Sequence, residues 1–571
     1  MTAIQVLVPT IALALLVPAM FRRQRRKAGL QAGALPQRWR RRLAATTALS
    51  MALVIGGLAT SASLASAEGD PTGADTPAAV ATEPDAAPIT TDDLSARLDK
   101  DEISLNLTWL MVGGVLVLFM QAGFALVETG FTRAKNGSHT MMMNLVIFAL
   151  GAVGWFTCGY AFMFGSTSNS LIGLSTSSTS WAIGDWNILA HNGFFLGGGA
   201  YDVGVMAFFF FQLVFMDATA TIPTGAMAER WKFSSFCVWG LFASMILYPV
   251  FGNWVWGGGF LSQLGAIGPK WGHGAVDFAG SGVVHAMGGV AAFWGAKILG
   301  PRIGKFDKDG NPRAIPGHHL PQAFLGTMIL LVGWMGFNGA STFASTDLRF
   351  TVVITNTILS AAFGCLTTMF VMWKKFGKPD PSMTCNGLLA GLVAITAPCA
   401  FVPPWAAAVI GVVAGVLVVY AVIIVENTFK IDDPVGAVAV HGANGLWGLL
   451  AVGIFADGKY GDGLNGVTGK GVAGILSGDG GQMAAQLVTI AVLITWCSLA
   501  SVAFFKILDA TIGMRSKPED EIAGLDMPEM GALAYPDFLE AQGSVFFPVD
   551  RPLTVDLTPA SAKTAREEVG S

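Results

Sequence analysis

The sequence predicts an all-α polytopic membrane protein with eleven transmembrane helices, and its charge and glycine content carry this prediction. Of 571 residues, 53% are hydrophobic and only 13% are charged, whereas about 25% of the residues in soluble domains are charged. Glycine occurs 71 times, and small residues let membrane helices pack closely. The composition excludes soluble enzymes, nucleic-acid-binding proteins and disordered scaffolds. The six cysteines are too sparse for a disulfide scaffold.

Residues 1–67 have the pattern of a targeting region. Basic residues around Arg40 precede the apolar stretch Leu43–Ala59, and Ala65-Ser66-Ala67 offers a cleavage site. This order of charge, apolarity and small residues is typical of a secretory signal peptide. An earlier apolar run either precedes a true start at Met20 or forms an additional amino-terminal helix.

Three further regions follow the targeting region. Residues 68–106 are rich in Ala, Pro, Thr and Asp and lack a periodic apolar face, so we expect a disordered acidic segment outside the cytoplasm. Residues 107–511 form the predicted membrane domain. Residues 512–571 form a predicted cytoplasmic tail.

The membrane domain divides into eleven stretches of about 20 apolar residues, the length that spans a bilayer. They are Leu107–Gly130, Met141–Gly165, Gly204–Ala226, Lys232–Val255, Phe278–Gly300, Leu320–Ala340, Phe350–Trp373, Met383–Val402, Pro404–Asn427, Val435–Gly458 and Met483–Ala510. Most basic loop residues lie in the odd-numbered loops. The positive-inside rule therefore predicts that the first helix starts outside and the tail lies inside (N-out, C-in) once the signal peptide is cleaved.

A sequence repeat links the fifth and tenth spans. The pattern D-x-x-G-x-x-x-V-H runs from Asp277 to His285 and again from Asp433 to His441. The two copies are five helices apart, which forces opposite orientations, so we expect a 5+5 inverted repeat with the eleventh helix outside it. Each histidine lies eight residues, or roughly 12 Å, further along its helix than the aspartate. Both histidines are therefore expected to meet near the middle of the membrane.

Ionisable side chains inside a membrane are expensive and usually line a pathway. A single histidine could be a packing residue, but two at equivalent repeat positions favour a pathway. A two-histidine metal site is the rival interpretation, and no third ligand appears at matching depth. We expect no metal, no cofactor and no enzymatic motif.

Aromatic residues surround the expected position of the histidines. Phe215 lies in the third span, Trp256 begins a Trp-Gly-Gly-Gly run, and Phe337 and Ser341 end the sixth span. By the predicted topology all of these stretches lie toward the outer face. Aromatic faces attract cations, most strongly where water is excluded.

Taken together, these motifs resemble the ammonium transporter (Amt/Mep/Rh) family, in the form of a bacterial Amt-type member. The resemblance runs in order from about residue 107 to Tyr535 and rests on motifs that are specific only as a set. They are Ala122-Gly123-Phe124, Arg133-Ala134-Lys135-Asn136, Ala228-Glu229-Arg230, Trp256-Gly257-Gly258-Gly259, Asp277-Phe278-Ala279-Gly280, Gly336-Phe337-Asn338, Asp432-Asp433-Pro434 and His441-Gly442.

The resemblance implies an outer ammonium site at Phe215, Trp256 and Ser341. Asp277 would support this site without binding the ion directly. Phe215 and Phe337 would stack as a gate below it.

The resemblance also implies a pore lined by the paired His285 and His441, with Thr396 at a polar break in the eighth helix. Asp433 is the inner acid related to Asp277 by the repeat. A homotrimer in the cell membrane, with one pore per subunit and lipid around it, is implied as well. The tail resembles the family's regulatory tail, and the resemblance implies a PII-type signal protein as a partner, which often blocks such pores from the inside. One position departs from the family pattern, since Met530 stands before Gly531 where the family commonly has a histidine.

The function implied is transport of ammonium or ammonia across the cell membrane, by cation recruitment, deprotonation and conduction through an apolar pore. A passive ammonia channel and an ammonium sensor are the alternatives. Two acids remain unassigned. Asp217 could face another helix, a neighbouring subunit or the pore, and Glu128 is expected to be a cap or a loop anchor.

Overall fold

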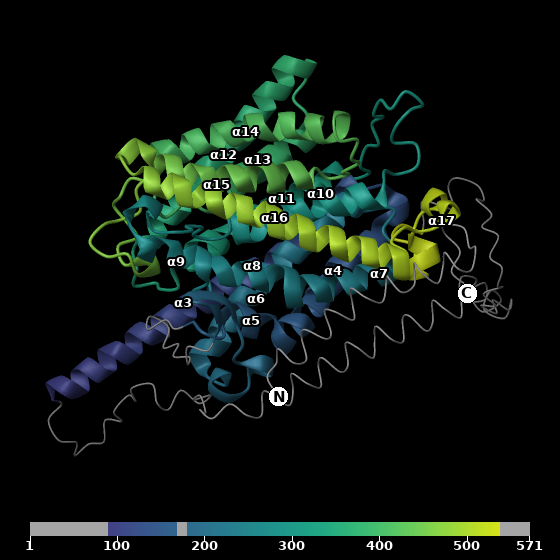
Figure 1. Cartoon of the computed structure of the whole chain (residues 1–571). Coiled ribbons are helices and arrows are strands. Elements are labelled where there is room, and N and C mark those ends of the chain that lie inside the picture. The colour runs from purple at the N-terminus through teal and green to yellow at the C-terminus, as the bar shows by residue number, and fades with distance from the viewer. Residues whose placement is uncertain (1–89, 168–179, 537–571) are drawn as a thin grey trace, which may run out of the picture.

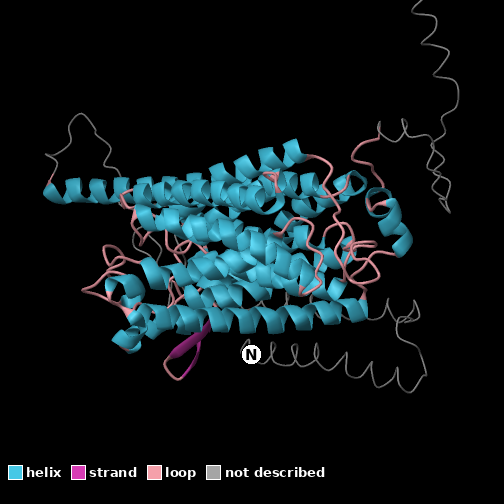
Figure 2. Cartoon of the chain, turned by 90° about the horizontal axis from the view of Figure 1, so that it is seen from above, coloured by secondary structure: helices cyan, strands magenta, loops and turns pink. Residues whose placement is uncertain are grey.

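The structure is a computed structural model that describes residues 90–167 and 180–536. These residues form a bundle of long helices and one short β-hairpin, which lies at the edge of the bundle (Figure 2). Ten helices in this described part are long and apolar enough to cross a membrane. The predicted all-α membrane architecture is thereby confirmed in its coarse form. The predicted signal region lies outside the described residues, and the orientation stays a prediction.

The elements follow one another in the order of Figure 1. The α-helices are α3 (Thr91–Phe131), α4 (Gly137–Gly154), α5 (Tyr160–Phe164), α6 (Val203–Met227), α7 (Phe233–Phe242), α8 (Tyr248–Val255), α9 (Phe260–Ile267), α10 (Met287–Leu299), α11 (Leu320–Gly339), α12 (Phe350–Phe376), α13 (Pro381–Ile395), α14 (Pro404–Asn427), α15 (Asn444–Phe455), α16 (Gly480–Thr511) and α17 (Pro518–Ala523). The antiparallel strands are β1 (Ser180–Ile183) and β2 (Trp186–Ala190).

Short helical turns connect or interrupt these elements. Five are π-helical, namely η2 (Trp155–Gly159), η6 (Ala243–Leu247), η8 (Ser281–Ala286), η10 (Val438–Ala443) and η13 (Asp526–Met530). The 3₁₀ turns are η1 (Ala134–Asn136), η4 (Phe194–Leu196), η5 (Gly198–Ala200), η7 (Pro269–Trp271), η9 (Ala340–Thr342), η11 (Leu464–Gly466) and η12 (Ile475–Ser477). Such π-turns inside helices occur frequently at functional sites.

The first helix begins earlier than the sequence predicts. Residues 91–106 were expected to be disordered but are the amino-terminal part of α3, which projects beyond the bundle (Figure 1). Thr90 caps the helix, since its hydroxyl accepts a hydrogen bond from the backbone of Asp93 and the Asp93 carboxylate accepts one from the backbone of Thr90. Extending an existing helix avoids the cost of nucleation, so this polar stretch can be helical without an apolar face. Residues 68–89 lie outside the described part.

The predicted eighth span is shorter than expected. Instead of residues 383–402, α13 covers only 15 residues and ends at Ile395. Pro398 cannot continue a helix, and the chain forms turns instead. Asn356 on α12 compensates by donating hydrogen bonds to the carbonyls of Cys399 and Val402, at 2.9 and 2.8 Å. The structure therefore has ten long apolar helices and one short one in its described part, and the count of eleven spans is not confirmed.

Helices α3 and α11 pack backbone to backbone through glycines. A Cβ atom on Gly326 would lie 2.6 Å from the carbonyl oxygen of Gly123, and one on Gly123 would lie 3.0 Å from that of Gly326. Both separations are too short for a side chain. Close packing of α3 against α11 thus requires glycine at these two positions, in agreement with the predicted role of small residues.

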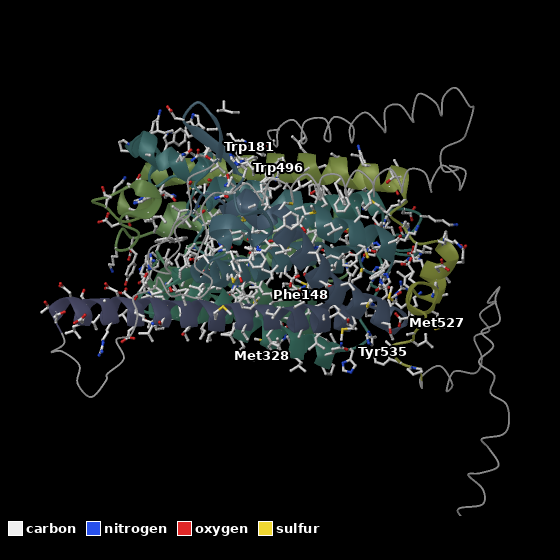
Figure 3. All side chains as sticks on the ribbon, turned by 90° about the horizontal axis from the view of Figure 1, so that it is seen from below. Phe148, Trp181, Met328, Trp496, Met527 and Tyr535 are labelled. Carbon is white, nitrogen blue, oxygen red and sulfur yellow. The ribbon has the colours of Figure 1, made fainter. Side chains whose placement is uncertain are left out.

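The carboxyl-terminal tail folds back on the end of the bundle where α3 ends and α4 begins. Lys135 donates hydrogen bonds to the carbonyls of Glu521 and Ile522. The Asp526 carboxylate accepts a hydrogen bond from the backbone of His139. Figure 3 shows Met527 and Tyr535 together at this end, which we call the inner end in keeping with the predicted topology.

A buried cluster of ion pairs holds the loops of the inner end together. Arg302 binds both carboxylate oxygens of Asp432, at 2.8 and 2.9 Å, and one oxygen of Glu229 at 2.7 Å. Arg133 completes the cluster from the other side of Glu229. Burial opposes ionisation of Asp432, but the neighbouring Arg230 and the Arg302 hydrogen bonds outweigh it and hold the pKa of Asp432 well below its ordinary value.

Candidate functional site

Each copy of the sequence repeat forms a turn closed by its aspartate. The Asp277 carboxylate accepts hydrogen bonds from the backbone N–H groups of Gly280, Gly282 and Val283, at 3.0, 2.9 and 2.8 Å. A carboxylate with three such partners can be buried without a cation. Asp277 therefore fixes the start of η8 and does so from inside the protein, where only 4% of it is exposed.

The second copy has the same arrangement. Asp433 accepts hydrogen bonds from the backbone of Val435, Gly436 and Val438, at 3.3, 2.9 and 2.8 Å. Gly436 has φ of 80° and its counterpart Gly280 has φ of 109°. Only glycine adopts such angles readily, which explains the glycine in the motif. The correspondence supports the repeat, while its inverted orientation stays a prediction.

The two aspartate turns bring the histidines together. Nδ1 of His285 and Nδ1 of His441 lie 3.2 Å apart, and both rings are buried. One imidazole must donate and the other accept in this hydrogen bond, if both are neutral. The predicted meeting of the two histidines is therefore observed.

Glycines allow the two broken helices to cross at the histidines. A Cβ on Gly289 would lie 2.1 Å from the backbone nitrogen of Gly442, next to His441. A Cβ on Gly445 would lie 2.4 Å from the carbonyl oxygen of Ser281. Each of these glycines stands four residues after its own histidine and contacts the other repeat.

Aromatic rings enclose His285 on its outer side. Its ring stacks on Trp334 and Phe337, with centroids 4.9 and 5.4 Å away. Phe337 in turn stacks on Phe215, at 4.0 Å and an interplanar angle of 24°. The two phenylalanines predicted to form a gate therefore lie face to face next to the histidines. Trp334 belongs to the same aromatic stretch of the sequence as Phe337, one turn earlier on α11, but the sequence assigned it no role.

Thr396 lies behind this aromatic group. Its hydroxyl accepts a hydrogen bond from the indole N–H of Trp334 at 2.9 Å and donates one to the carbonyl of Leu392 at 2.7 Å. It lines neither of the two cavities described next. Its contacts thus hold the Trp334 ring, and its predicted place in the pore stays a prediction.

A cavity of about 610 Å³ lies on the other side of the stacked phenylalanines. We call it the outer cavity; its walls include all four residues predicted for the outer site, namely Phe215, Trp256, Asp277 and Ser341. Gln212 and Phe343 also line it and were not predicted.

Two hydrogen bonds orient the outer-site side chains. The indole N–H of Trp256 donates to the backbone carbonyl of Asp277 at 2.7 Å. The Ser341 hydroxyl donates to the carbonyl of Phe337 at 2.8 Å. The hydroxyl oxygen thereby keeps lone pairs that can accept hydrogen bonds from a ligand in the cavity.

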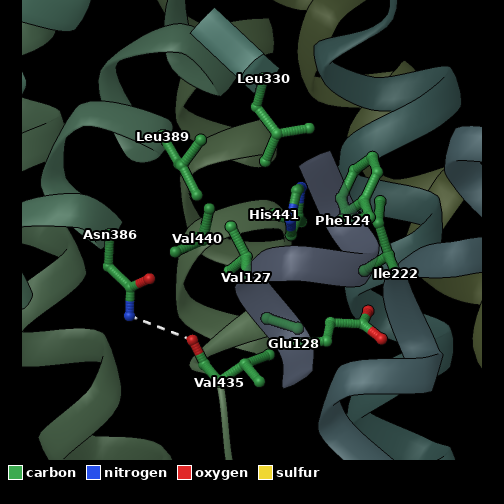
Figure 4. Close-up of a pocket in the computed structure, with 11 residues that line it drawn as sticks. Phe124, Val127, Glu128, Ile222, Leu330, Asn386, Leu389, Val435, Val440 and His441 are labelled. Carbon is green, nitrogen blue, oxygen red and sulfur yellow. Dashed lines mark hydrogen bonds between the residues drawn. The ribbon is translucent and has the colours of Figure 1, made fainter. Parts of the chain in front are cut away.

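A much smaller pocket of about 20 Å³ lies on the inner side of the histidines (Figure 4). We call it the inner pocket. Its walls are mostly apolar, and its polar side chains are His441, Glu128 and Asn386. The Asn386 amide donates to the carbonyl of Val435 at 3.1 Å. Glu128 was expected to be a cap or a loop anchor; it is buried in the wall of this pocket and accepts hydrogen bonds from Thr224 and Asn144.

Asp217 lies on α6, two residues after Phe215, and is 2% exposed. It lines neither the outer cavity nor the inner pocket. One of its carboxylate oxygens has no hydrogen-bond partner among the described residues.

The fold and the site together define a helical membrane protein with a buried histidine pair between an outer cavity and a small inner pocket. Residues 108–535 match the profile of the Ammonium Transporter Family. The chain is 46% identical over 448 residues to ammonium transporter Amt2 of Archaeoglobus fulgidus, covering 77% of this chain and 90% of that protein. It is 35% identical over 467 residues to ammonium transporter 1 member 3 of Solanum lycopersicum, covering 78% and 96%. The chain belongs to the ammonium transporter family.

Solved structures agree with this assignment. A structure described as a sensor Amt protein superposes with a TM-score of 0.67 at 33% identity, covering 76% of this chain and all of that one. Candida albicans Mep2 superposes with a TM-score of 0.63 at 28% identity, covering 78% and 94%. The membrane location and the transporter class follow from the family, whereas the bacterial subtype stays a prediction.

Proposed function

We propose that the chain recruits ammonium in the outer cavity, removes a proton, and conducts ammonia past the histidine pair to the inner side. The observation that carries this proposal is the stacked pair Phe215 and Phe337, which separates a large polar cavity from a small apolar pocket. A hydrated ion fits the first space but not the second. A neutral molecule of the size of water fits both.

The outer cavity suits a cation that donates hydrogen bonds. The ring of Trp256 provides an attractive face for a cation, and the Ser341 oxygen provides an acceptor. Potassium is similar in size to ammonium but cannot donate a hydrogen bond or release a proton. Ammonium can do both, so only ammonium can shed its charge before the apolar region, where a charged group costs about 3 kcal/mol or more.

The histidine pair is suited to pass the released proton or to bind ammonia. Nε2 of His285 is buried and has no partner among the described residues. It is therefore free to exchange a hydrogen bond with a passing molecule. A neutral imidazole has one nitrogen that donates and one that accepts, so the 3.2 Å contact with His441 can serve as one step of a proton relay.

Current measurements on the reconstituted protein test this proposal. Purified protein in supported bilayers is expected to carry a saturable, pH-dependent current with ammonium and none with potassium. The variants His285→Ala and His441→Ala are expected to lose either the current or the selectivity. If both variants keep the wild-type current and selectivity, the histidine pair has no part in the mechanism.

Two alternatives are distinguished by the same measurement. A passive ammonia channel would transport ammonia without any ammonium current. An ammonium sensor is favoured by the similarity to the structure described as a sensor Amt protein; it would bind ammonium with neither current nor flux. Binding without transport in the wild-type protein would replace our proposal with the sensor.

The assembly is also a proposal. Exposed apolar side chains cover the bundle surface, among them Val115 and Phe119 on α3 and Leu325 and Val332 on α11, and such surfaces face lipid or another subunit in a membrane protein. We propose a homotrimer with one pore per subunit, and native mass spectrometry of the purified protein tests it. The docked tail offers a surface for a PII-type partner, which a pull-down with the full-length protein tests.

A further inference from the structure

Glu128 is a buried acid on the path from the histidines to the inner end, and the proposed function assigns it no role. It lies on α3, three residues before the helix ends, and is 3% exposed. Its side chain borders the inner pocket together with His441 (Figure 4). The inner pocket holds about one molecule of the size of water, since one such molecule needs about 10–15 Å³.

Hydrogen bonds hold the Glu128 side chain between helices, but no cation pairs with it among the described residues. Thr224 donates a hydrogen bond to one oxygen at 2.5 Å, and Asn144 donates to the other at 2.7 Å. None of the ion pairs among the described residues includes Glu128. Near the carboxyl end of a helix, a negative charge is opposed by the helix dipole. An uncharged side chain of the same shape would fit this position at lower cost, so a cap or anchor does not explain the acid.

The Glu128 side chain is packed against α6 on one side and lines the inner pocket on another. A Cβ on Gly225 of α6 would lie 3.1 Å from Oε1 of Glu128 and 2.5 Å from a methyl group of Val435, so glycine there makes room for the carboxylate. The titratable groups that face Glu128 are His441 across the pocket and Asp433 below it. The other walls of the pocket are apolar except for Asn386, whose amide is already bonded.

We propose that Glu128 is the proton acceptor of the inner pocket. On this proposal, which rests on the proposed function, one molecule in the pocket bridges His441 and Glu128. The N–H bond of protonated His441 breaks as its proton bonds to the bridging molecule, and a second proton of that molecule leaves it to form an O–H bond on the Glu128 carboxylate. The O–H bond of Glu128 then breaks as an N–H bond forms on ammonia. Ammonium is re-formed, Glu128 is a carboxylate again, and both atoms and charge balance over the cycle.

The test compares Glu128→Gln with the wild-type protein in proteoliposomes. Glutamine keeps the shape: its oxygen can accept from Asn144, and its NH₂ group can donate to the Thr224 oxygen while the Thr224 hydroxyl donates to the carbonyl of Thr221. It cannot take up the proton. We expect the ammonium current to fall about 100-fold, the typical contribution of a positioned acid or base. Uptake of neutral ammonia, measured as internal alkalinisation with an entrapped pH dye, should continue at close to the wild-type rate. Glu128→Asp, which keeps an acid at a longer distance, should restore part of the current.

Asp217→Asn is the matched control, because it removes another buried acid of the same bundle that lines neither cavity. Its current should equal that of the wild type. The proposal is overturned if Glu128→Gln keeps the wild-type current, or if it loses current and ammonia uptake together with a lower unfolding temperature. An equal loss in Asp217→Asn overturns it as well. Absence of any ammonium current in the wild type refutes the proposed function itself, which separates the two failures.

Discussion

The outer cavity and the inner pocket approach the same histidine pair from opposite sides, yet they differ about thirtyfold in volume, 610 against 20 Å³. The outer cavity has charged walls, including Asp277, Arg349 and Lys459, whereas the inner pocket has Glu128 as its only acid. The repeat makes the two aspartate turns alike, but it does not make the two spaces alike. The difference teaches that two equivalent turns can border unequal spaces, because residues from both halves of the chain line each space.

The aspartate turns give the largest expected effect. Asp277→Ala leaves three buried backbone N–H groups without partners, each costing about 1–3 kcal/mol, so folding and transport should both be lost. Asp433 is partly exposed, and water can replace its carboxylate in Asp433→Ala, so that variant should fold and keep part of the transport. Membrane expression and ammonium uptake of the two variants measure this asymmetry. Equal damage in both would show that the halves are energetically equivalent after all.

Filling the two cavities tests the difference in size directly. Leu389→Phe places a larger side chain in the wall of the inner pocket and so narrows the pocket. It should lower ammonia flux at least about tenfold, which corresponds to about 1.4 kcal/mol in the free-energy barrier. Leu464→Phe makes the same change in the wall of the outer cavity, which has space for the larger ring, and should leave the flux close to the wild-type value. Flux and unfolding temperature are measured together, because overpacking also destabilises. If both variants transport normally, the inner pocket is not on the path.

Ser341→Ala tests the recruitment of the ion in the outer cavity. Loss of one hydrogen-bond acceptor of about 1 kcal/mol should raise the half-saturating ammonium concentration about fivefold, while the maximal current stays the same. Titration of the current with ammonium measures both quantities. A lower maximal current with unchanged half-saturation would place the serine in the conduction step instead.

The smallest effect concerns the inner end and its dependence on pH. The pKa of Asp432 is held below its ordinary value by Arg230 and Arg302 despite burial. Its contribution to stability is therefore fully present above the unfolded pKa of about 3.9 and is lost as the pH falls from there toward the folded pKa. Thermal unfolding between about pH 5 and pH 2 should show this loss, and Asp432→Asn should weaken the dependence. If the unfolding temperature of Asp432→Asn falls with pH as steeply as that of the wild type, other carboxylates cause the acid sensitivity.

The sequence was most informative where chemistry repeats at a fixed spacing. The pairs Asp277–His285 and Asp433–His441 could be found because the same turn must be built twice, and the structure confirms that the histidines meet. Phe215 and Phe337 were identified through the family resemblance, and they stack as expected. Trp256 and Ser341 were identified in the same way, and both line the outer cavity.

Features that depend on a single contact were missed. Nothing near Glu128 in the sequence indicates that Thr224 and the inner pocket lie beside it, because these contacts join residues far apart in the chain. Thr396 was assigned through the family resemblance, but the hydrogen bond from Trp334 is a tertiary contact that the sequence does not indicate. The start of α3 was missed because residues 91–106 are polar, and the capping box formed by Thr90 and Asp93 stabilises them as a helix despite this composition.

The glycine contacts at the helix crossing bear on how the site can change. Gly289 contacts the turn that carries His441, and Gly445 contacts the turn that carries His285. A larger residue at either glycine would therefore displace the histidine of the other repeat and leave its own in place. A substitution near one histidine therefore disturbs the helix that carries the other histidine. Substitutions that the site tolerates are expected to occur in pairs, with one member in each repeat.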